Sequence, residues 1–128
     1  MFFRKNKPKT YMEIQIDAKK TEISIYEKHG SIRGNSISLD YGFKDVLEKS
    51  YEEARFFDEE IGEMSLESFL ESHYDKAYSN IKSFISRIEF SILCKMKLPS
   101  KIERIYLKGI GSELFVRELK STFLNCYI

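Results

Sequence analysis

The sequence predicts an α/β domain, close to the α+β boundary, that combines an antiparallel β-meander with a mixed sheet. Three observations lead to this prediction. Residues 11–39 alternate apolar and polar side chains in short runs, apolar residues recur at helical spacing over 43–96, and an apolar run at 102–107 precedes a glycine turn. A helical crossover that returns to a parallel strand would give the order βββ–α–α–β–α, with helices packed on the sheet.

Three β-strands are expected first. The alternating runs are Met12–Asp17, Thr21–Tyr26 and Ser31–Leu39, and short breaks separate them at 18–20 and 28–30. Breaks of this length are typical of hairpins, so the three strands should form a meander.

Helical spacing begins after Gly42. The apolar members of the first helix are Phe43, Val46, Leu47, Ala54, Phe57 and Ile61, and we expect Gly62 to end it. A second helical phase starts at Leu66. It leads into the clearest amphipathic stripe, formed by Tyr78, Ile81, Phe84, Ile85, Ile88, Ile92 and Met96. Pro99 should end this helix, because the residue before a proline disfavours the α conformation.

The last quarter of the chain predicts a strand, a turn and a helix. Residues 102–107 are typical of a buried strand, Gly109–Ser112 of a tight turn, and Leu114–Phe123 of a final helix. Residues 125–128 fit the start of a further strand.

Length and composition suit one packed domain over residues 11–128. The chain has 128 residues, of which 42% are hydrophobic and 32% charged. Residues 1–10 are basic and contain Pro8, so we expect a leader or flexible tail there. No apolar run approaches the roughly 18 residues of a membrane span. These features predict a cytoplasmic protein without direct membrane insertion.

The net charge of +1 hides an uneven distribution. Residues 45–75 carry eleven acidic and two basic side chains, whereas residues 76–128 carry ten basic and four acidic ones. No segment has the basic excess that is typical of nucleic-acid binders, so we expect no nucleic-acid partner. The acidic segment is either a solvated helix face, which is the commoner case, or a docking surface.

The first candidate site is the turn from Asp17 to Thr21. An aspartate, a threonine and backbone N–H groups between two strands can hold a metal–phosphate group, and Lys19 and Lys20 add positive charge. The alternative is a plain charged hairpin turn that binds nothing, which is the commoner case for such a motif taken alone.

The second candidate site is the glycine turn. Gly109 and Gly111 would let the backbone approach a ligand, and the start of the next helix favours an anion. Ser112 would equally serve as the N-cap of that helix.

Other reactive side chains predict no site. His29 and His73 have no partners at metal-ligand spacing, and no catalytic triad can be assembled from them, so neither a metal nor a catalytic residue is expected. Cys94 lies beside the apolar stripe, so we expect it to be buried.

In their order and spacing, these segments resemble the bacterial actin-like ATPases. Residues 16–25 (IDAKKTEISI) resemble the second phosphate-binding hairpin of that family, and residues 38–42 (SLDYG) resemble the turn into its next helix. Residues 51–54 (YEEA) resemble its EEAE stretch, and residues 102–112 (IERIYLKGIGS) its adenosine-loop strand. The resemblance covers residues 11–128 and is closest to the pilus-assembly protein PilM and the cell-division protein FtsA. It implies a ribonuclease H-like, actin-like half-domain, namely the second, C-terminal half.

Two departures from the family pattern concern the glycines. Ala18 and Ile110 stand where the family has glycine, and a Cβ hinders close approach to phosphate. The family binds nucleotide between two halves, so we expect no ATP hydrolysis by this chain alone, and ATP with magnesium only together with a partner half. The resemblance then implies half of a cofactor-binding site, made of Asp17, Lys19, Lys20, Thr21, Gly109, Gly111 and Ser112.

Three hypotheses of function follow. The first is a non-catalytic protein-interaction module related to the ATPases of type IV pilus assembly or cell division, which docks onto a machine at the inner membrane through a sheet edge or the acidic face of residues 45–75. The second is the nucleotide-binding half of a larger actin-like ATPase whose first half is absent from this chain, with Asp17 and Thr21 contacting phosphates through magnesium. The third is a homodimer, formed through the surface that a half-fold would expose. All three require the loops at 17–21 and 109–112 to converge on one side of the sheet.

Overall fold

The computed structural model describes residues 10–27, 30–97, 102–122 and 126–127, which form a mixed five-stranded sheet with helices. The strand order is β3-β2-β1-β4-β5. The strands are β1 (Tyr11–Ile16), β2 (Thr21–Glu27), β3 (Gly30–Leu39), β4 (Arg104–Lys108) and β5 (Cys126–Tyr127). Residues 1–9, for which we expect a leader or tail, lie outside the described residues.

The sheet has the predicted meander and crossover. Strand β1 pairs antiparallel with β2, where Ile14 lies opposite Ile23, and β2 pairs antiparallel with β3. Strand β4 runs parallel to β1 on its other side, and β5 runs parallel to β4. The predicted α/β class and mixed sheet are therefore confirmed.

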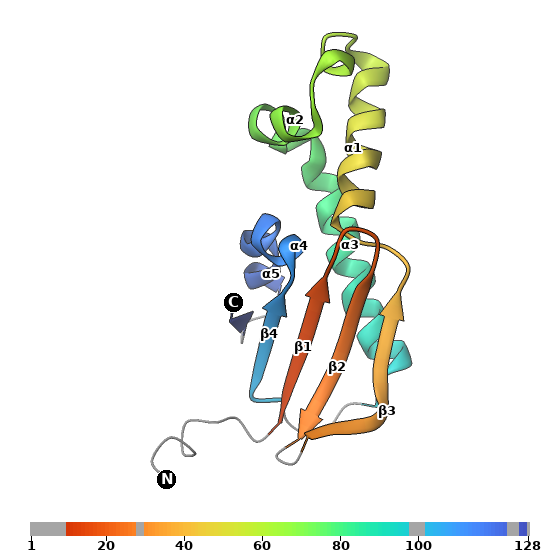
Figure 1. Ribbon diagram of the computed structural model, residues 1–128, viewed down its shortest axis with the longest axis vertical. Helices are drawn as coiled ribbons and strands as arrows, with labels where there is room; N and C mark the ends of the chain where they lie inside the picture. The colour runs from red at the N-terminus through yellow and green to blue at the C-terminus, as the bar shows by residue number, and fades with distance from the viewer. Residues whose placement is uncertain (1–9, 28–29, 98–101, 123–125, 128) are drawn as a thin grey trace.

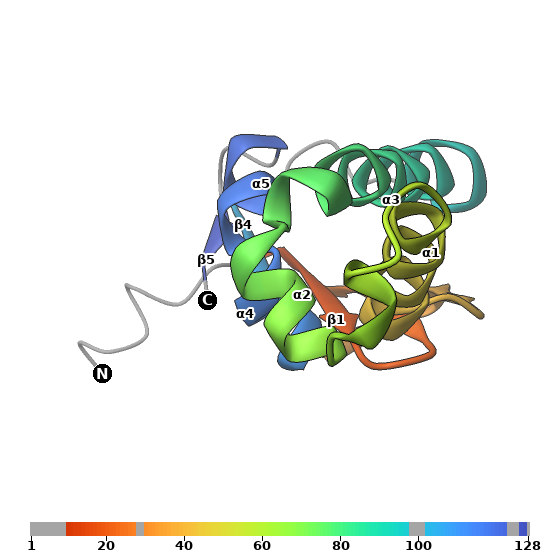
Figure 2. The same ribbon diagram turned by 90° about the horizontal axis from the view of Figure 1, so that it is seen from above.

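Helices connect β3 to β4 and follow β4. They are α1 (Phe43–Phe57), the short 3-10 helix η2 (Ile61–Glu63), α2 (Leu66–Ser72), α3 (Tyr74–Lys95), α4 (Ile110–Leu114) and α5 (Val116–Thr122). Helices α1 and α2 project beyond the upper end of the strands, and α3 returns behind the sheet (Figure 1). Seen from above, α1 and α3 lie side by side, and α4 and α5 cover the β4 side (Figure 2). None of the helices within the described residues could cross a membrane.

The core lies between the sheet and α3. Apolar residues of β1 and β2 meet the buried face of α3, and α5 closes the β4 side with Leu119. Six residues of the predicted α3 stripe are buried, namely Ile81, Phe84, Ile85, Ile88, Ile92 and Met96. The seventh, Tyr78, is 43% exposed.

Helix α1 ends earlier than predicted. Its last residue is Phe57, and the backbone N–H of Asp58 donates to Ala54 O as the cap. The Asp58 carboxylate accepts the N–H of Glu60 (3.0 Å), which starts the turn that buries Ile61. Gly62 therefore lies in η2 and does not end α1. The turn at Asp58, which its carboxylate stabilises through the Glu60 N–H and which periodicity does not report, accounts for the difference.

Three further predictions need correction. The final helix is two helices, because the chain leaves helical geometry at Phe115 and buries that ring against Phe84. Helix α3 ends at Lys95, before the segment 98–101 that contains Pro99 and lies outside the described residues. Cys94 is exposed, since the buried positions of α3 nearest to it are Ser91 and Ile92. Phe123 also lies outside the described residues, and β5 confirms a last strand at 126–127.

The C-terminal end of β1 is enclosed by backbone on two sides. A Cβ built on Gly42, at the start of α1, would lie 2.0 Å from Asp17 O. A Cβ on Gly109 would lie 2.5 Å from Ile16 O, and one on Gly111 would lie 2.3 Å from Ile16 Cγ2. Gly109 also has a φ of +88°, which favours glycine. Glycine is therefore required where α1 and α4 meet β1.

A side-chain hydrogen bond joins α3 to α5. The Tyr74 hydroxyl donates to Glu118 Oε2 (2.6 Å), and Glu118 is only 7% exposed. The Arg117 guanidinium lies 5.2 Å from the centre of the Tyr74 ring. Burial, and next the hydrogen bond to Glu118, raises the pKa of Tyr74 to about 12.

The close approach at Gly42 predicts the effect of a single methyl group. Gly42→Ala should lower the free energy of unfolding by about 1–3 kcal/mol, because the neighbours of the new Cβ are backbone atoms that cannot move aside cheaply. Gly62→Ala is the matched control, since its Cβ would lie 3.8 Å from the nearest atom, Arg55 Cβ. Urea denaturation measures both variants, and an equal loss in the two would contradict the assignment.

The Tyr74–Glu118 hydrogen bond predicts a pH-dependent contribution to stability. Tyr74→Phe should lower the free energy of unfolding at neutral pH by about 1.5–3 kcal/mol, because a buried carboxylate loses a donor. The pKa of Tyr74 lies above its usual value of 10.0, so this stabilisation is present below pH 10 and is lost as the pH rises towards 12.

Denaturation at a series of pH values tests this prediction, with Tyr78→Phe as the control on the exposed ring. The loss between pH 10 and 12 should be smaller in Tyr74→Phe than in the wild type and in Tyr78→Phe. Equal pH profiles for all three proteins would show that the Tyr74 hydroxyl does not stabilise the fold.

Candidate functional site

The two predicted loops lie side by side. Because β1 and β4 are parallel and Gln15 lies opposite Lys108, the loops that follow these strands leave the sheet at the same edge. The position of a Cβ on Gly109 is 3.2 Å from Asp17 Oδ1. The structure thus brings residues 17–21 and 109–112 together at one rim, as expected.

The hairpin after β1 uses its carbonyl groups to cap α1. Asp17 O accepts the N–H of Phe43 (3.0 Å), and Ala18 O accepts the N–H of Lys44 (3.0 Å). The first N–H groups of a helix lack partners within the helix, so these bonds satisfy two of them. Sequence reasoning missed Gly42, which makes this approach sterically possible. The available signal was a glycine directly before the first apolar residue of the helix.

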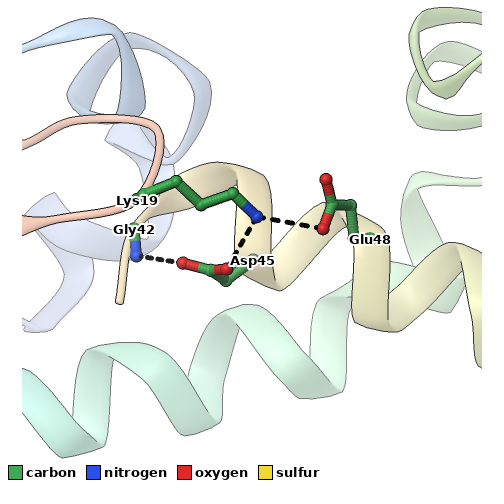
Figure 3. A network of polar contacts seen from close by, with 4 residues as sticks. All are labelled: Lys19, Gly42, Asp45 and Glu48. Carbon is green, nitrogen blue, oxygen red and sulfur yellow. Dashed lines mark hydrogen bonds and ion pairs between the residues drawn. The ribbon is translucent and has the colours of Figure 1, made fainter. Parts of the chain in front are cut away.

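Lys19 is held by α1. Its ammonium group lies 3.0 Å from Asp45 Oδ1 and 3.1 Å from Glu48 Oε2, and the other Asp45 oxygen accepts the N–H of Gly42 at 2.8 Å (Figure 3). The hydrogen bonds to Asp45 and Glu48 raise the pKa of Lys19. Lys20 pairs with Glu22 (2.7 Å), and that hydrogen bond raises the pKa of Lys20. Both amines are therefore engaged by carboxylates of this chain.

Thr21 and Asp17 differ in whether their side-chain oxygens remain available to a ligand. Thr21 is fully buried, and its hydroxyl donates to Tyr41 O (2.7 Å). Asp17 is half-buried, and its carboxylate accepts a hydrogen bond from Gln15 Nε2 (3.2 Å). Asp17 is thus the predicted site residue that still presents a charged group at the rim without an ion pair among the described residues.

The glycine turn is not capped by Ser112. The N-cap of α4 is Gly109, and Ser112 lies inside the helix, where its hydroxyl donates to Gly109 O (2.6 Å). The expected N-cap role of Ser112 is therefore wrong, because the helix starts one turn earlier than predicted. Ser112 and Gly111 are both buried, and Ile110 is exposed.

A phosphate site needs free donors, and a magnesium site needs free oxygen ligands. Within residues 10–27 and the other described ranges, the N–H groups of Ala18 and Lys19 form no backbone–backbone hydrogen bond. The hydroxyls of Thr21 and Ser112 donate to main-chain carbonyls, and both lysines are ion-paired. As arranged here, this set fits a magnesium–phosphate group poorly, and the nucleotide role of these residues stays a prediction.

No group of three potential metal ligands occurs among the residues that the structure describes. His73 lies between α2 and α3, where its ring stacks on Phe69 at a centroid distance of 5.9 Å and its Nδ1 lies 2.8 Å from Ser72 Oγ. These contacts show a structural use of His73. His29 lies outside the described residues.

Comparisons with known proteins find similarity in structure alone. No protein-family model and no curated protein matches the sequence. Among solved structures, apo psk41 ParM has a TM-score of 0.74 at 15% identity, over 93% of this chain and 35% of that one. Ta0583, an archaeal actin homolog solved in complex with ADP, has a TM-score of 0.74 at 14% identity, over 94% of this chain and 43% of that one.

A third similar structure is a ParM from Clostridium botulinum in a 15-stranded filament, with a TM-score of 0.70 at 15% identity, over 93% of this chain and 41% of that one. The chain therefore spans about two fifths of the length of these proteins. Identities this low show a shared fold and nothing narrower. This chain has the actin-like fold, over a length that corresponds to part of the actin-like proteins.

Proposed function

We propose that this chain is a non-catalytic protein-interaction module built on an actin-like half-domain. The single observation that carries the proposal is the internal use of the hairpin after β1. Its carbonyl groups cap α1, Lys19 pairs with two α1 carboxylates, and the Thr21 hydroxyl binds Tyr41 O. In this proposal the hairpin holds α1 in place and does not bind phosphate.

The helical projection supports docking as the function. Helices α1 and α2 extend beyond the sheet and carry most of the acidic segment of residues 45–75 (Figure 1). A projecting, charged surface of this kind selects partners by charge and speeds association with them. The module would dock through this face or through a sheet edge, and β3 is one edge of the sheet.

The finer assignment is part of the proposal. The resemblance of residues 16–25 and 102–112 to PilM and FtsA supports the second, C-terminal half of such a protein. It also supports a partner in a pilus-assembly or cell-division machine at the cytoplasmic side of the inner membrane. A homodimer formed by the surface that normally meets the first half is a further proposal of the same kind.

One observation favours a second candidate, the nucleotide-binding half of a larger actin-like ATPase. The Asp17 carboxylate and Gly109 lie next to each other at the rim, and two hairpin N–H groups have no backbone partner in the described part of the chain. ADP is bound by Ta0583, a protein of which this chain spans 43%. In this proposal the complete site for ATP and magnesium would form only together with a partner half, and this chain alone would bind ATP weakly through its half of that site.

Isothermal calorimetry with ATP and magnesium separates the two candidates. The wild-type chain should bind ATP more weakly than a Kd of about 1 mM. Ala18→Gly should not change this, because in the interaction module the hairpin supports α1 and holds no phosphate. A nucleotide half would instead show tighter binding in Ala18→Gly, since removing the Cβ lets the backbone approach a phosphate.

If the wild-type chain binds ATP, Asp17→Asn tests whether the Asp17 carboxylate takes part in the binding. Micromolar binding by the wild type that Asp17→Asn weakens would contradict the interaction module and support the nucleotide half. Thermal unfolding of each variant confirms that the comparison concerns folded protein.

A further inference from the structure

Two phenylalanines stand unpacked at the end of α1. Phe56 is 83% exposed and Phe57 is 86% exposed, although Phe57 is one of the apolar residues that recur at helical spacing in the sequence. Their rings contact each other edge to face, with a centroid distance of 5.2 Å. Single exposed hydrophobic residues are ordinary, but an exposed pair of large aromatic rings marks an interaction surface.

Carboxylates flank this pair in the sequence, and those of Glu52, Glu59 and Glu63 line the same hollow as Phe56. Residues 52–63 contain six acidic side chains and one basic one, and all six acids are exposed. They are Glu52, Glu53, Asp58, Glu59, Glu60 and Glu63. The basic residue, Arg55, already pairs with Glu52 (3.0 Å). We call residues 52–63 the acidic aromatic tip.

The acidic aromatic tip has a defined shape. The Tyr51 hydroxyl is close to two carbonyls, Gly62 O (2.8 Å) and Met64 O (3.0 Å), which holds the turn after α1 against the helix. Ile61 is buried in the same turn. A hollow of about 430 Å³ lies beside the Phe56 ring, lined by Glu52, Arg55, Phe56, Glu59, Gly62 and Glu63. A surface held in this way loses little entropy when it binds.

From this arrangement we infer that the acidic aromatic tip binds a basic segment of a partner protein, one whose apolar side chains contact Phe56 and Phe57 while its lysines and arginines face the flanking carboxylates. The argument is charge complementarity around an apolar centre: aromatic anchors supply affinity, and charges at the rim supply selectivity and speed. The inference deepens the proposed interaction module and rests on it, because it names the surface and the chemistry of the partner.

The negative charge of the tip also disfavours two other possible occupants, a second copy of the chain and an anionic membrane. A second copy that met this surface with its own tip would bring two acidic groups together, and an anionic lipid surface would be repelled. A solvated face without a partner would need the carboxylates but not the aromatic pair. These occupants are outcomes of the test.

The probe is a labelled model peptide of about 14 residues in which pairs of leucine alternate with pairs of lysine, which places an apolar and a basic face on one helix. Fluorescence anisotropy with the full chain should show saturable binding that weakens as salt is added. Phe56→Ser together with Phe57→Ser should weaken binding by at least about tenfold, as expected for anchor residues.

Phe90→Ser is the matched control, because Phe90 is also an exposed phenylalanine (65%) but lies on α3, away from the tip sequence. It should leave the affinity unchanged. Two control peptides, with serine in place of leucine and with glutamate in place of lysine, should each bind at least about tenfold more weakly, because each lacks one of the two required contacts. All the substituted positions are exposed, so circular dichroism should show unchanged folding.

Several results would overturn the inference. Equal affinity of the Phe56→Ser/Phe57→Ser variant, or equal binding of the glutamate peptide, would remove the tip as the site. Concentration-dependent dimerisation that this variant abolishes would assign the surface to a second copy. Binding to phosphatidylglycerol vesicles that it abolishes would assign the surface to a membrane.

The result of the calorimetry with ATP is independent of the peptide-binding measurements. Nucleotide binding together with peptide binding would refute the non-catalytic module and leave the tip as a docking surface. Absence of both would leave the module without this surface.

Discussion

The fold depends on how closely three separate pieces of backbone meet at the end of β1. Gly42 places the start of α1 against Asp17, and Gly109 and Gly111 place the start of α4 against Ile16. No side chain fits at these contacts, so the meander, the projecting helices and the β4–α4 unit have one mutual arrangement. The polar contacts at the rim follow from this arrangement, because it brings the hairpin carbonyls within reach of the first N–H groups of α1.

The same junction bears on function. The residues that the family resemblance associates with phosphate are the residues that join the hairpin to its surroundings. Thr21 holds the segment that precedes α1 through Tyr41 O, and Lys19 holds α1 itself. Each polar group has a limited number of hydrogen bonds to give, so a group that is used within the domain is lost to a ligand unless the contact is broken. Because these polar groups support the domain and are not free to bind phosphate, we prefer a docking module to a nucleotide-binding half.

Periodicity in the sequence predicted what depends on local pattern. The alternation at 11–39, the stripe on α3 and the run at 102–107 report which face of each element is buried, and the parallel pairing of β1 and β4 then places the two candidate loops together. The end of α1 at Phe57, the position of Ser112 within α4 and the exposure of Cys94 were beyond this reasoning. They depend on a hydrogen bond from the Glu60 N–H to the Asp58 carboxylate, on the positive φ of Gly109 and on which face of α3 packs against the core.

Helix α1 connects the hairpin after β1 with the acidic aromatic tip. Its 15 residues form a rod about 22 Å long, fixed at one end to the carbonyls of Asp17 and Ala18 and free of the sheet at the other. A force applied at the far end produces a torque on the near end, because a helix bends little over this length. A partner bound at Phe57 would therefore pull on an element whose other end is held by the hairpin, and α3, which packs along α1, would take part of the load.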